Sequence, residues 1–247
     1  MNSYTNFAKY YDILMHKDIS YSKICDFIEN IFILKDLNPN LICDLACGTG
    51  NVSIPLAKRG YELISVDKSI DMLNIAREKA QKDNLDILFL NQSITRLDLF
   101  GTCDAFLCMI DGINYILNPS SLIYAFKRIK DCFLNPGGIL IFDISSYYKL
   151  SSVIGNNTFI HDTDEIFYAW ENRFLNNKQL SDMYLNFFIK KKNGYSRFCE
   201  RHLQRAYTSD EIKIALKKAG FTDIDTYNGF SFTDVNEKTE RIVFCAR

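Results

Sequence analysis

The sequence has no excess of charge of either sign, because 29 Lys and Arg residues are balanced by 30 Asp and Glu residues. A protein that follows the phosphates of nucleic acid needs a positive surface, so nucleic acid is a disfavoured partner unless a local basic patch provides one. Charged residues make up 24% of the chain and hydrophobic residues 47%, which argues against disorder. A chain of 247 residues can bury one substantial core, and we expect one main domain with room for an inserted lobe.

Membrane segments, secretion signals and zinc motifs are also missing. No apolar run approaches the length that crosses a bilayer, and the first residues lack the basic and apolar regions of a signal peptide. The eight cysteines include no C-x-x-C pair, which argues against zinc. Cys43 and Cys108 lie in apolar runs, where a free thiol acts as a small hydrophobic group. We therefore expect a reduced, cytoplasmic protein with no metal and no membrane partner.

Apolar and amphipathic segments alternate over the first 146 residues. Apolar side chains repeat at helical spacing over residues 21–36. We expect strands at 41–45, 61–66, 87–90, 105–109 and 139–144, and helices at 52–59, from Ser69 onward and at 121–133. This alternation predicts a parallel sheet with helices on both faces.

The pattern changes after about residue 146. Residues 158–206 lose helical periodicity and are rich in aromatic side chains, and Asn193-Gly194 is a strong hairpin signal because a type I′ turn needs positive φ twice. We expect an antiparallel meander here. A capping box at Thr208 and Glu211 then starts a helix that ends at Gly220, followed by strands at about 222–230 and 240–246. The predicted division is an α/β domain at 37–147 and 207–247 with an inserted β lobe at 148–206.

A glycine turn connects the first expected strand to the next helix. The strand ends in Asp44, and Gly48-Thr49-Gly50 then opens the helix. Glycine permits a tight turn and lets a ligand approach the backbone, while the helix start offers free N–H groups. The third glycine of the dinucleotide pattern G-x-G-x-x-G is missing. An anionic Asp44 would repel a pyrophosphate but attract a cationic amine.

A second acidic residue stands at the end of the next strand. Asp67 follows the glycine turn by roughly 20 residues, where a carboxylate can accept both hydroxyls of a ribose. A glycine turn alone can be purely conformational, but the turn together with Asp44 and Asp67 specifies a ligand. An amine at one end and a ribose at the other describe S-adenosylmethionine better than NAD.

At this point the residues resemble the class I S-adenosylmethionine-dependent methyltransferases. Residues 44–50 look like their first motif, 67–73 like their second, 134–140 like the turn into their fifth strand, and 219–221 and 240–244 like their closing helix and strand. The resemblance implies a Rossmann-like α/β fold with a seven-stranded, mostly parallel sheet and an antiparallel last strand. It implies S-adenosylmethionine as co-substrate. The expected cofactor-binding residues are Tyr11, Tyr21, Asp44, Ala46, Cys47, Gly48, Gly50, Asp67, Lys68, Met72, Gln92, Ser93 and Met109.

Two further segments resemble a bacterial subgroup of small-molecule N-methyltransferases. Residues 7–12 and 111–115 carry this likeness, and the subgroup has an added β lobe over the cofactor. Some of its members dimethylate amino sugars attached to nucleotides, so a small-molecule amine is the expected acceptor. One departure concerns the adenine amine, where the family often has an acidic residue after a Gln. This chain has Gln92 followed by Ser93, and either can accept that hydrogen bond.

Methyl transfer from a sulfonium is a direct displacement, so the protein must mainly align the reactants and exclude water. Tyr11 and Tyr21 can cover the sulfonium with their aromatic faces, which makes residues 1–36 a helical lid, or they can merely dock a helix. Asp111 and Asn114 follow the fourth strand and can orient the acceptor amine, although Asn114 can also cap a turn. His202 is the candidate base, with a structural histidine as the alternative.

Other functions stay open at this stage. The chain could bind S-adenosylmethionine without chemistry, its aromatic lobe forming a homodimer interface. A macromolecular acceptor is a further alternative. A nicotinamide oxidoreductase is disfavoured by Asp44 and by the missing third glycine.

Overall fold

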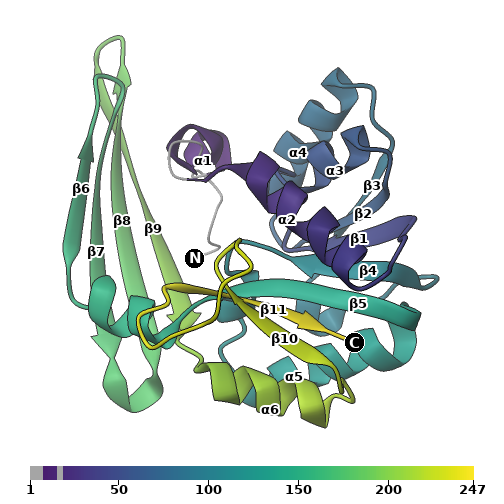
Figure 1. Ribbon diagram of the computed structural model, residues 1–247. Coiled ribbons are helices and arrows are strands. Elements are labelled where there is room, and N and C mark those ends of the chain that lie inside the picture. The colour runs from purple at the N-terminus through teal and green to yellow at the C-terminus, as the bar shows by residue number, and fades with distance from the viewer. Residues whose placement is uncertain (1–7, 16–18) are drawn as a thin grey trace.

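The fold is built around a seven-stranded sheet in the order β10-β11-β5-β4-β1-β2-β3 (Figure 1). This computed structural model describes residues 8–15 and 19–247. Pairings in the sheet are parallel except those of β11, which runs antiparallel to β5 and β10. The predicted sheet is therefore confirmed. Its strands are β1 (Leu41–Leu45), β2 (Glu62–Asp67), β3 (Ile87–Asn91), β4 (Cys103–Cys108), β5 (Leu134–Ser145), β10 (Ile224–Asn228) and β11 (Arg241–Ala246).

Helices cover both faces of this sheet. In Figure 1, α2, α3 and α4 lie on one face, and α5 and α6 lie on the other. The helices are α1 (Ala8–Met15), α2 (Tyr21–Leu34), α3 (Ser53–Lys58), α4 (Ile70–Lys82), α5 (Pro119–Arg128) and α6 (Ser209–Lys218). Short helical turns are η1 (Ile94–Arg96), η2 (Gly112–Tyr115), η3 (Ile129–Phe133), η4 (Lys149–Val153) and η5 (Asn176–Lys178). In the described parts of the chain, no helix is long and apolar enough to cross a membrane.

The strands contribute to two cores because neighbouring side chains of a strand point to opposite faces. In β1, Ile42 packs into the core beneath α2 and α3, whereas the next residue, Cys43, packs into the core beneath α5 and α6. Both side chains are fully buried. This two-sided burial explains why the strands read as continuous apolar runs in the sequence.

Helix ends follow the capping signals. The Ser69 hydroxyl accepts from the Met72 N–H, and Thr208 and Glu211 form the predicted capping box. The helix expected at 121–133 starts earlier, at Pro119, because Asn118 caps it, and it ends at Arg128 before the π-helical turn η3. The following strand starts earlier than residue 139, because Leu134 already pairs with Cys103 ahead of an irregularity.

A separate antiparallel sheet forms the inserted lobe. Its order is β6-β7-β8-β9. The strands are β6 (Thr158–Asp162), β7 (Ile166–Leu175), β8 (Leu180–Lys191) and β9 (Gly194–Arg205). The chain leaves the main sheet at the carboxyl end of β5 and returns from β9 into α6, so the lobe stands beside the carboxyl ends of the parallel strands (Figure 1).

The turn between β8 and β9 differs from the prediction. The hairpin is present, but Lys191 pairs with Gly194, so Lys192 and Asn193 form the turn. Gly194 has a φ of 120°, whereas Asn193 has no positive φ. The prediction of a type I′ turn at Asn193-Gly194 was therefore wrong. The turn is centred one residue earlier, and Gly194, the first residue after it, has the positive φ.

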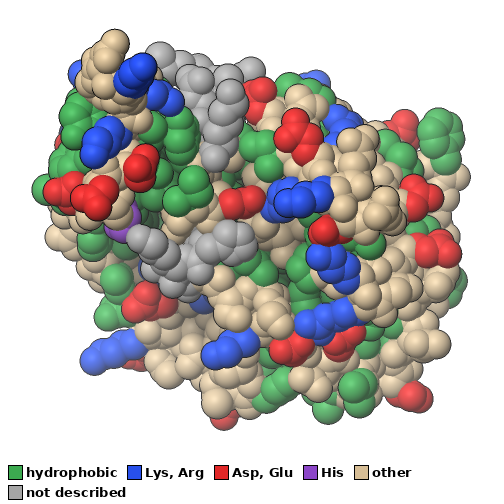
Figure 2. Space-filling model, turned by 90° about the horizontal axis from the view of Figure 1, so that it is seen from above, with side chains coloured by type: hydrophobic (Ala, Val, Ile, Leu, Met, Phe, Trp, Pro, Cys, Tyr) green, Lys and Arg blue, Asp and Glu red, His purple; other side chains and the backbone are tan. Residues whose placement is uncertain are grey.

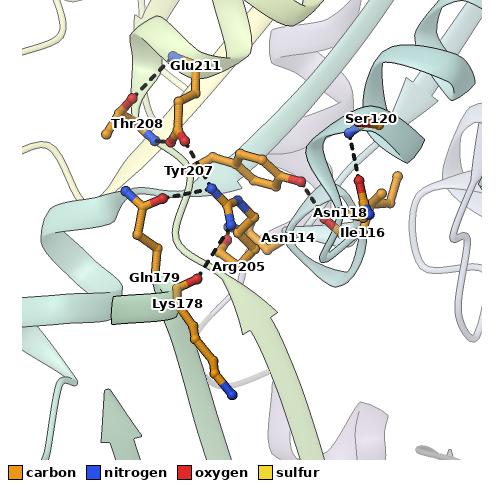
Figure 3. A network of polar contacts seen from close by, with 10 residues as sticks. All are labelled: Asn114, Ile116, Asn118, Ser120, Lys178, Gln179, Arg205, Tyr207, Thr208 and Glu211. Atoms are coloured by element: carbon orange, nitrogen blue, oxygen red, sulfur yellow. Dashed lines mark hydrogen bonds and ion pairs between the residues drawn. The ribbon is translucent and has the colours of Figure 1, made fainter. Parts of the chain in front are cut away.

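Asn114 joins the lobe to the main sheet. Its side-chain nitrogen donates to the carbonyl oxygens of Ser145 at 3.0 Å and Arg205 at 2.8 Å, and its oxygen accepts from the Ser145 N–H at 2.9 Å. Figure 3 shows the side of this junction at Asn114 and Arg205, where the Tyr207 hydroxyl also donates to the Ile116 carbonyl oxygen. Because Asn114 is completely buried and its amide bonds to backbone on both sides of the junction, its side chain joins the lobe to the main sheet and does not cap the local turn.

We predict that Asn114→Ala destabilises the junction, because the variant leaves buried backbone groups of β5 and β9 without their partner. The free energy of unfolding should fall by about 2–4 kcal/mol. Urea denaturation measures the change. The matched control is Asn176→Ala, an exposed asparagine of η5, which should change stability by less than about 0.5 kcal/mol. Equal losses in the two variants would contradict the structural role.

Candidate functional site

Two cavities lie at the carboxyl edge of the main sheet. Between β1 and β4 the strand order reverses, and in open α/β sheets ligands bind in the crevice at such a point. The first cavity has a volume of about 380 Å³. The predicted cofactor residues that line it are Tyr11, Tyr21, Asp44, Ala46, Cys47, Gly48, Asp67, Lys68, Met72, Gln92, Ser93 and Met109. The structure thus brings together side chains from α1, α2 and the ends of β1 to β4.

Gly50 is the predicted cofactor residue that does not line this cavity. It has a φ of 78°, and a Cβ on it would lie 3.2 Å from Ala76 of α4 and 3.2 Å from Ile54 of α3. The position therefore needs glycine for backbone conformation and for helix packing. Gly48 also has positive φ, but a Cβ there would meet nothing within 4 Å, so its backbone borders open space.

The Asp67 carboxylate connects the glycine turn to β2. It accepts from the Gly48 N–H at 2.9 Å and from the Ser69 N–H at 2.7 Å. Burial raises the pKa of Asp67, against the effect of these two N–H donors. The carboxylate lines the cavity, so a ligand hydroxyl could use its remaining lone pairs.

Asp44 lies deeper, with only 1% of its surface exposed. Its carboxylate accepts from the Ser53 hydroxyl at 2.5 Å, and Ser53 in turn accepts from Ser65 at 2.8 Å. Burial raises the pKa of Asp44 to about 7, and the nearby charge of Asp67 acts in the same direction. A cation bound beside Asp44 would relieve this cost of burying a negative charge.

Helix α1 is held over the glycine turn by a residue that the sequence analysis did not single out. Asp12 accepts from the Thr49 hydroxyl at 2.6 Å, the Asn51 amide at 2.8 Å and the Lys79 ammonium at 2.9 Å. Despite partial burial, these donors hold the pKa of Asp12 below its usual value. The only sequence signal was its place in the segment 7–12. Phe7 of that segment lies outside the described residues.

The loop after β3 forms another part of the wall of the first cavity. Gln92 donates to the Asp98 carbonyl oxygen and accepts from the Asp98 N–H, both at 2.9 Å, so its amide closes the loop. The Ser93 hydroxyl lies 3.0 Å from that of Thr95. Both residues line the cavity, but their hydrogen bonds to adenine stay a prediction.

The second cavity is larger, at about 670 Å³, and meets the first at Tyr11, Ile110 and Tyr115, which line both. Its walls come from α1, α2, the loop after β4, the segment after β5 and the inner face of the lobe. Apolar and aromatic side chains predominate, including Leu150, Trp170, Met183, Leu185 and Phe187. Asp111 and His202, the two predicted catalytic residues, line this cavity and not the first.

The loop between the cavities has an unusual backbone. Ile110 and Asp111 have φ values of 60° and 53°, a left-handed conformation that costs energy, especially for a β-branched residue. The buried Asp143 carboxylate accepts from the N–H groups of both, at 2.5 Å and 3.0 Å, and also pairs with Arg241. Arg241 bridges to Asp111 at 3.1 Å. Neither Asp143 nor Arg241 was predicted as a functional residue from the sequence, where the available signal was an acidic residue inside an apolar strand.

These contacts determine the protonation of Asp111. Burial alone would raise its pKa, but the Arg241 charge, with Lys149 and the Gln204 amide, outweighs burial and lowers the pKa of Asp111. Gln204 donates to the carboxylate at 2.7 Å. Asp111 is therefore an ionised carboxylate on the cavity wall, suited to accept hydrogen bonds and poorly suited to take a proton.

His202 carries a neutral imidazole. It is 4% exposed, and the Tyr115 hydroxyl lies 3.1 Å from its Nδ1. Burial lowers the pKa of His202 to about 4, and the charge of Lys68 contributes. At neutral pH the ring is uncharged and weakly basic, which suits a hydrogen-bonding role better than strong general-base catalysis. No three His, Cys, Asp or Glu side chains of residues 8–15 and 19–247 come together as a metal site.

Known proteins resemble this chain in sequence and in fold. Residues 42–138 match the family described as a methyltransferase domain. YqeM of Bacillus subtilis (strain 168), which carries the name of a methyltransferase, is 34% identical over 246 residues, covering 99% of this chain and 96% of YqeM. A solved S-adenosylmethionine-dependent methyltransferase from Clostridium acetobutylicum ATCC 824 is 38% identical, with a TM-score of 0.91 over 99% of this chain and 98% of that protein. The sugar N-methyltransferase KedS8 from Streptoalloteichus sp ATCC 53650 shares the fold, with a TM-score of 0.76 at 17% identity over 96% of this chain and 91% of that one.

Cofactor affinity should rise with pH as Asp44 loses its proton. The pKa of Asp44 is about 7 in the free protein, and a bound ammonium favours the charged carboxylate, so binding releases a proton. Below that pKa, affinity for S-adenosylhomocysteine should fall by up to about tenfold per pH unit, and above it the affinity should level off. Calorimetry across this range measures the slope. Asp44→Asn should abolish it; a slope that survives belongs to another group, such as Asp67, and contradicts this assignment.

The effects of substituting Asp143 and Arg241 on the free energy of unfolding should depend strongly on each other. Asp143→Asn removes the charge that faces Arg241 and weakens the hold on the left-handed loop, so the free energy of unfolding should fall by about 3–5 kcal/mol. Arg241→Met should also destabilise. The double variant should lose clearly less than the sum of the two, because either single change already removes the attraction between these two charges, which can be lost only once. Strictly additive losses in chemical denaturation would show that the two side chains act independently.

Proposed function

Because the chain belongs to the S-adenosylmethionine-dependent methyltransferases, we propose that it methylates an amine of a small-molecule acceptor held in the second cavity. The observation that carries this proposal is the shared boundary of the two cavities at Tyr11, Ile110 and Tyr115. A donor in the first cavity and an acceptor in the second would meet at that boundary, which is the geometry that a direct displacement requires.

A small acceptor suits the second cavity. Its volume of about 670 Å³ is within the usual range for small-molecule sites, and its walls are mainly apolar with a few converging polar groups. On the face seen in Figure 2, basic and acidic side chains are mixed, without a continuous patch of one sign. This supports a small molecule over a nucleic acid as acceptor.

An amine suits the polar groups of this cavity. Asp111 is ionised and His202 is neutral, so both can accept hydrogen bonds from an N–H group, whereas a carboxylate would repel an oxyanion nucleophile. The fold of KedS8, named as a sugar N-methyltransferase, supports the same nucleophile. Asp111 and His202 would orient the amine so that its lone pair faces the first cavity.

S-adenosylmethionine supplies an activated methyl group when bound, so the chain's residues need to hold and orient rather than to activate. Asp44 would pair with the amino group and Asp67 would accept the ribose hydroxyls. Tyr11 and Tyr21 would cover the sulfonium with their rings and exclude water. In this division of work, residues 1–36 form the lid, 37–147 and 207–247 bind the cofactor, and 148–206 cover the acceptor.

Radiolabelled methyl transfer to a panel of amines, including aminosugar nucleotides, tests the proposal. Label should appear on nitrogen, and Asp67→Ala should raise the KM for S-adenosylmethionine by about 5- to 150-fold, through loss of charge-assisted hydrogen bonds worth about 1–3 kcal/mol. The control Glu78→Ala changes an exposed carboxylate of α4 and should leave the KM unchanged. Cofactor binding without transfer to any acceptor would instead favour a binding protein without catalysis.

A further inference from the structure

Lys149 places an ammonium group on the wall of the second cavity. It is the first residue of η4, where the chain leaves β5 for the lobe, and its partly buried side chain lines the second cavity. Among the described residues, its ammonium forms no ion pair and donates no side-chain hydrogen bond. An ammonium buried in this way is costly unless something pairs with it.

Two of the three carboxylates that act on Lys149 already have partners, and the third, Glu240, is exposed to solvent. Asp143 and Asp111 both face Arg241, and Asp111 also accepts from Gln204. Burial lowers the pKa of Lys149, and the positive charge of Arg241 lowers it further, while Asp111, Glu240 and Asp143 act in the opposite direction. The net result is a lowered pKa, which means that the surroundings disfavour the charged ammonium. Titratable groups with perturbed pKa values that line a cavity are often functional. A second lysine, Lys23 of α2, lines the same cavity.

On this basis, and given the proposed function, we propose that Lys149 binds an anionic group of the acceptor, a carboxylate or a phosphate. The acceptor would then carry its nucleophilic amine at the boundary with the first cavity and its anion near Lys149. The apolar walls between, including Trp170 and Leu150, would contact the acceptor's body.

The position of Lys149 favours anion binding over the other role open to a lysine with a lowered pKa, that of a general base. A base must reach the nucleophile, which lies where the two cavities meet. Asp111 follows the boundary residue Ile110 in the chain, and Nδ1 of His202 lies 3.1 Å from the hydroxyl of the boundary residue Tyr115. Lys149 lies instead on η4, beyond β5, and lines the second cavity alone. An ammonium away from the reacting atoms can pair with an anion, but it cannot take the proton of the amine.

Trp170 provides a direct measurement, because it is the single tryptophan of the chain and lines this cavity. Its fluorescence in the full chain, saturated with S-adenosylhomocysteine, would report binding without turnover. Two matched pairs of probes separate the sources of the anion: phenylalanine against phenylalaninamide, and glucosamine 6-phosphate against glucosamine. In at least one pair, the member that carries the carboxylate or phosphate group should bind about tenfold more tightly than the member that lacks it.

Three variants make the assignment specific. Lys149→Met should abolish the anion preference, Lys149→Arg should retain it because the positive charge remains, and Lys82→Met, an exposed lysine of α4, should leave it unchanged. Unchanged binding of S-adenosylhomocysteine verifies that each variant is folded. A preference that persists in Lys149→Met overturns the proposal, and so does a Lys149→Arg variant that binds like Lys149→Met.

The binding test of Lys149 and the methyl-transfer test of the proposed function can fail independently of each other. If neither pair shows an anion preference, through equal binding or through no binding, the role of Lys149 is wrong even when methyl transfer to other amines is observed. Conversely, a Lys149-dependent anion preference without methyl transfer to any amine supports this site and counts against the proposed activity.

Discussion

The geometry between the two cavities depends on one buried carboxylate. Asp143 accepts hydrogen bonds from two consecutive N–H groups, those of Ile110 and Asp111, and thereby holds both residues in a left-handed conformation that they would not adopt alone. Arg241 compensates the charge of Asp143 and at the same time fixes Asp111. The carboxyl end of β4, the side of β5 and the start of β11 are thus joined at the place where donor and acceptor would meet.

The cofactor side relies on a similar use of carboxylates to organise backbone. Asp67 fixes the glycine turn through Gly48, and Asp12 fixes α1 over that turn through Thr49, Asn51 and Lys79. Ordering of α1 and ordering of the glycine turn are therefore linked. Asp44 differs from these carboxylates because it is buried with hydroxyl partners and no cation, which leaves its charge to be balanced by whatever binds beside it.

The sequence allowed the sheet and much of the first cavity to be predicted, because their signals are local. Strand–turn–helix patterns locate Asp44 and Asp67 at the carboxyl ends of neighbouring strands and Met72 in the first turn of the helix after β2, and the topology brings these segments together. Contacts between distant segments were not accessible in this way. Asp143 and Arg241 are 98 residues apart, and no local pattern pairs them. Gly50 was predicted to bind the cofactor, but the structure shows that it is required by packing against Ala76 of α4. The sequence pattern does not show where α4 lies relative to the glycine turn, so this packing could not be predicted. Lys149 lies in an irregular segment without any motif.

Asn114 holds both ends of the inserted lobe, since its single amide bonds to the backbone of Ser145, where the chain departs, and of Arg205, where it returns. At these two points the lobe is attached to the main domain through its backbone atoms, which any amino acid supplies. Side chains add contacts only locally, as where His202 and Gln204 of β9 meet Tyr115 and Asp111. Other positions of the lobe can therefore diverge in sequence while its two points of attachment stay constant. In the course of evolution, related proteins could change the acceptor that they recognise by changing the sequence of the lobe, while the main domain stays the same.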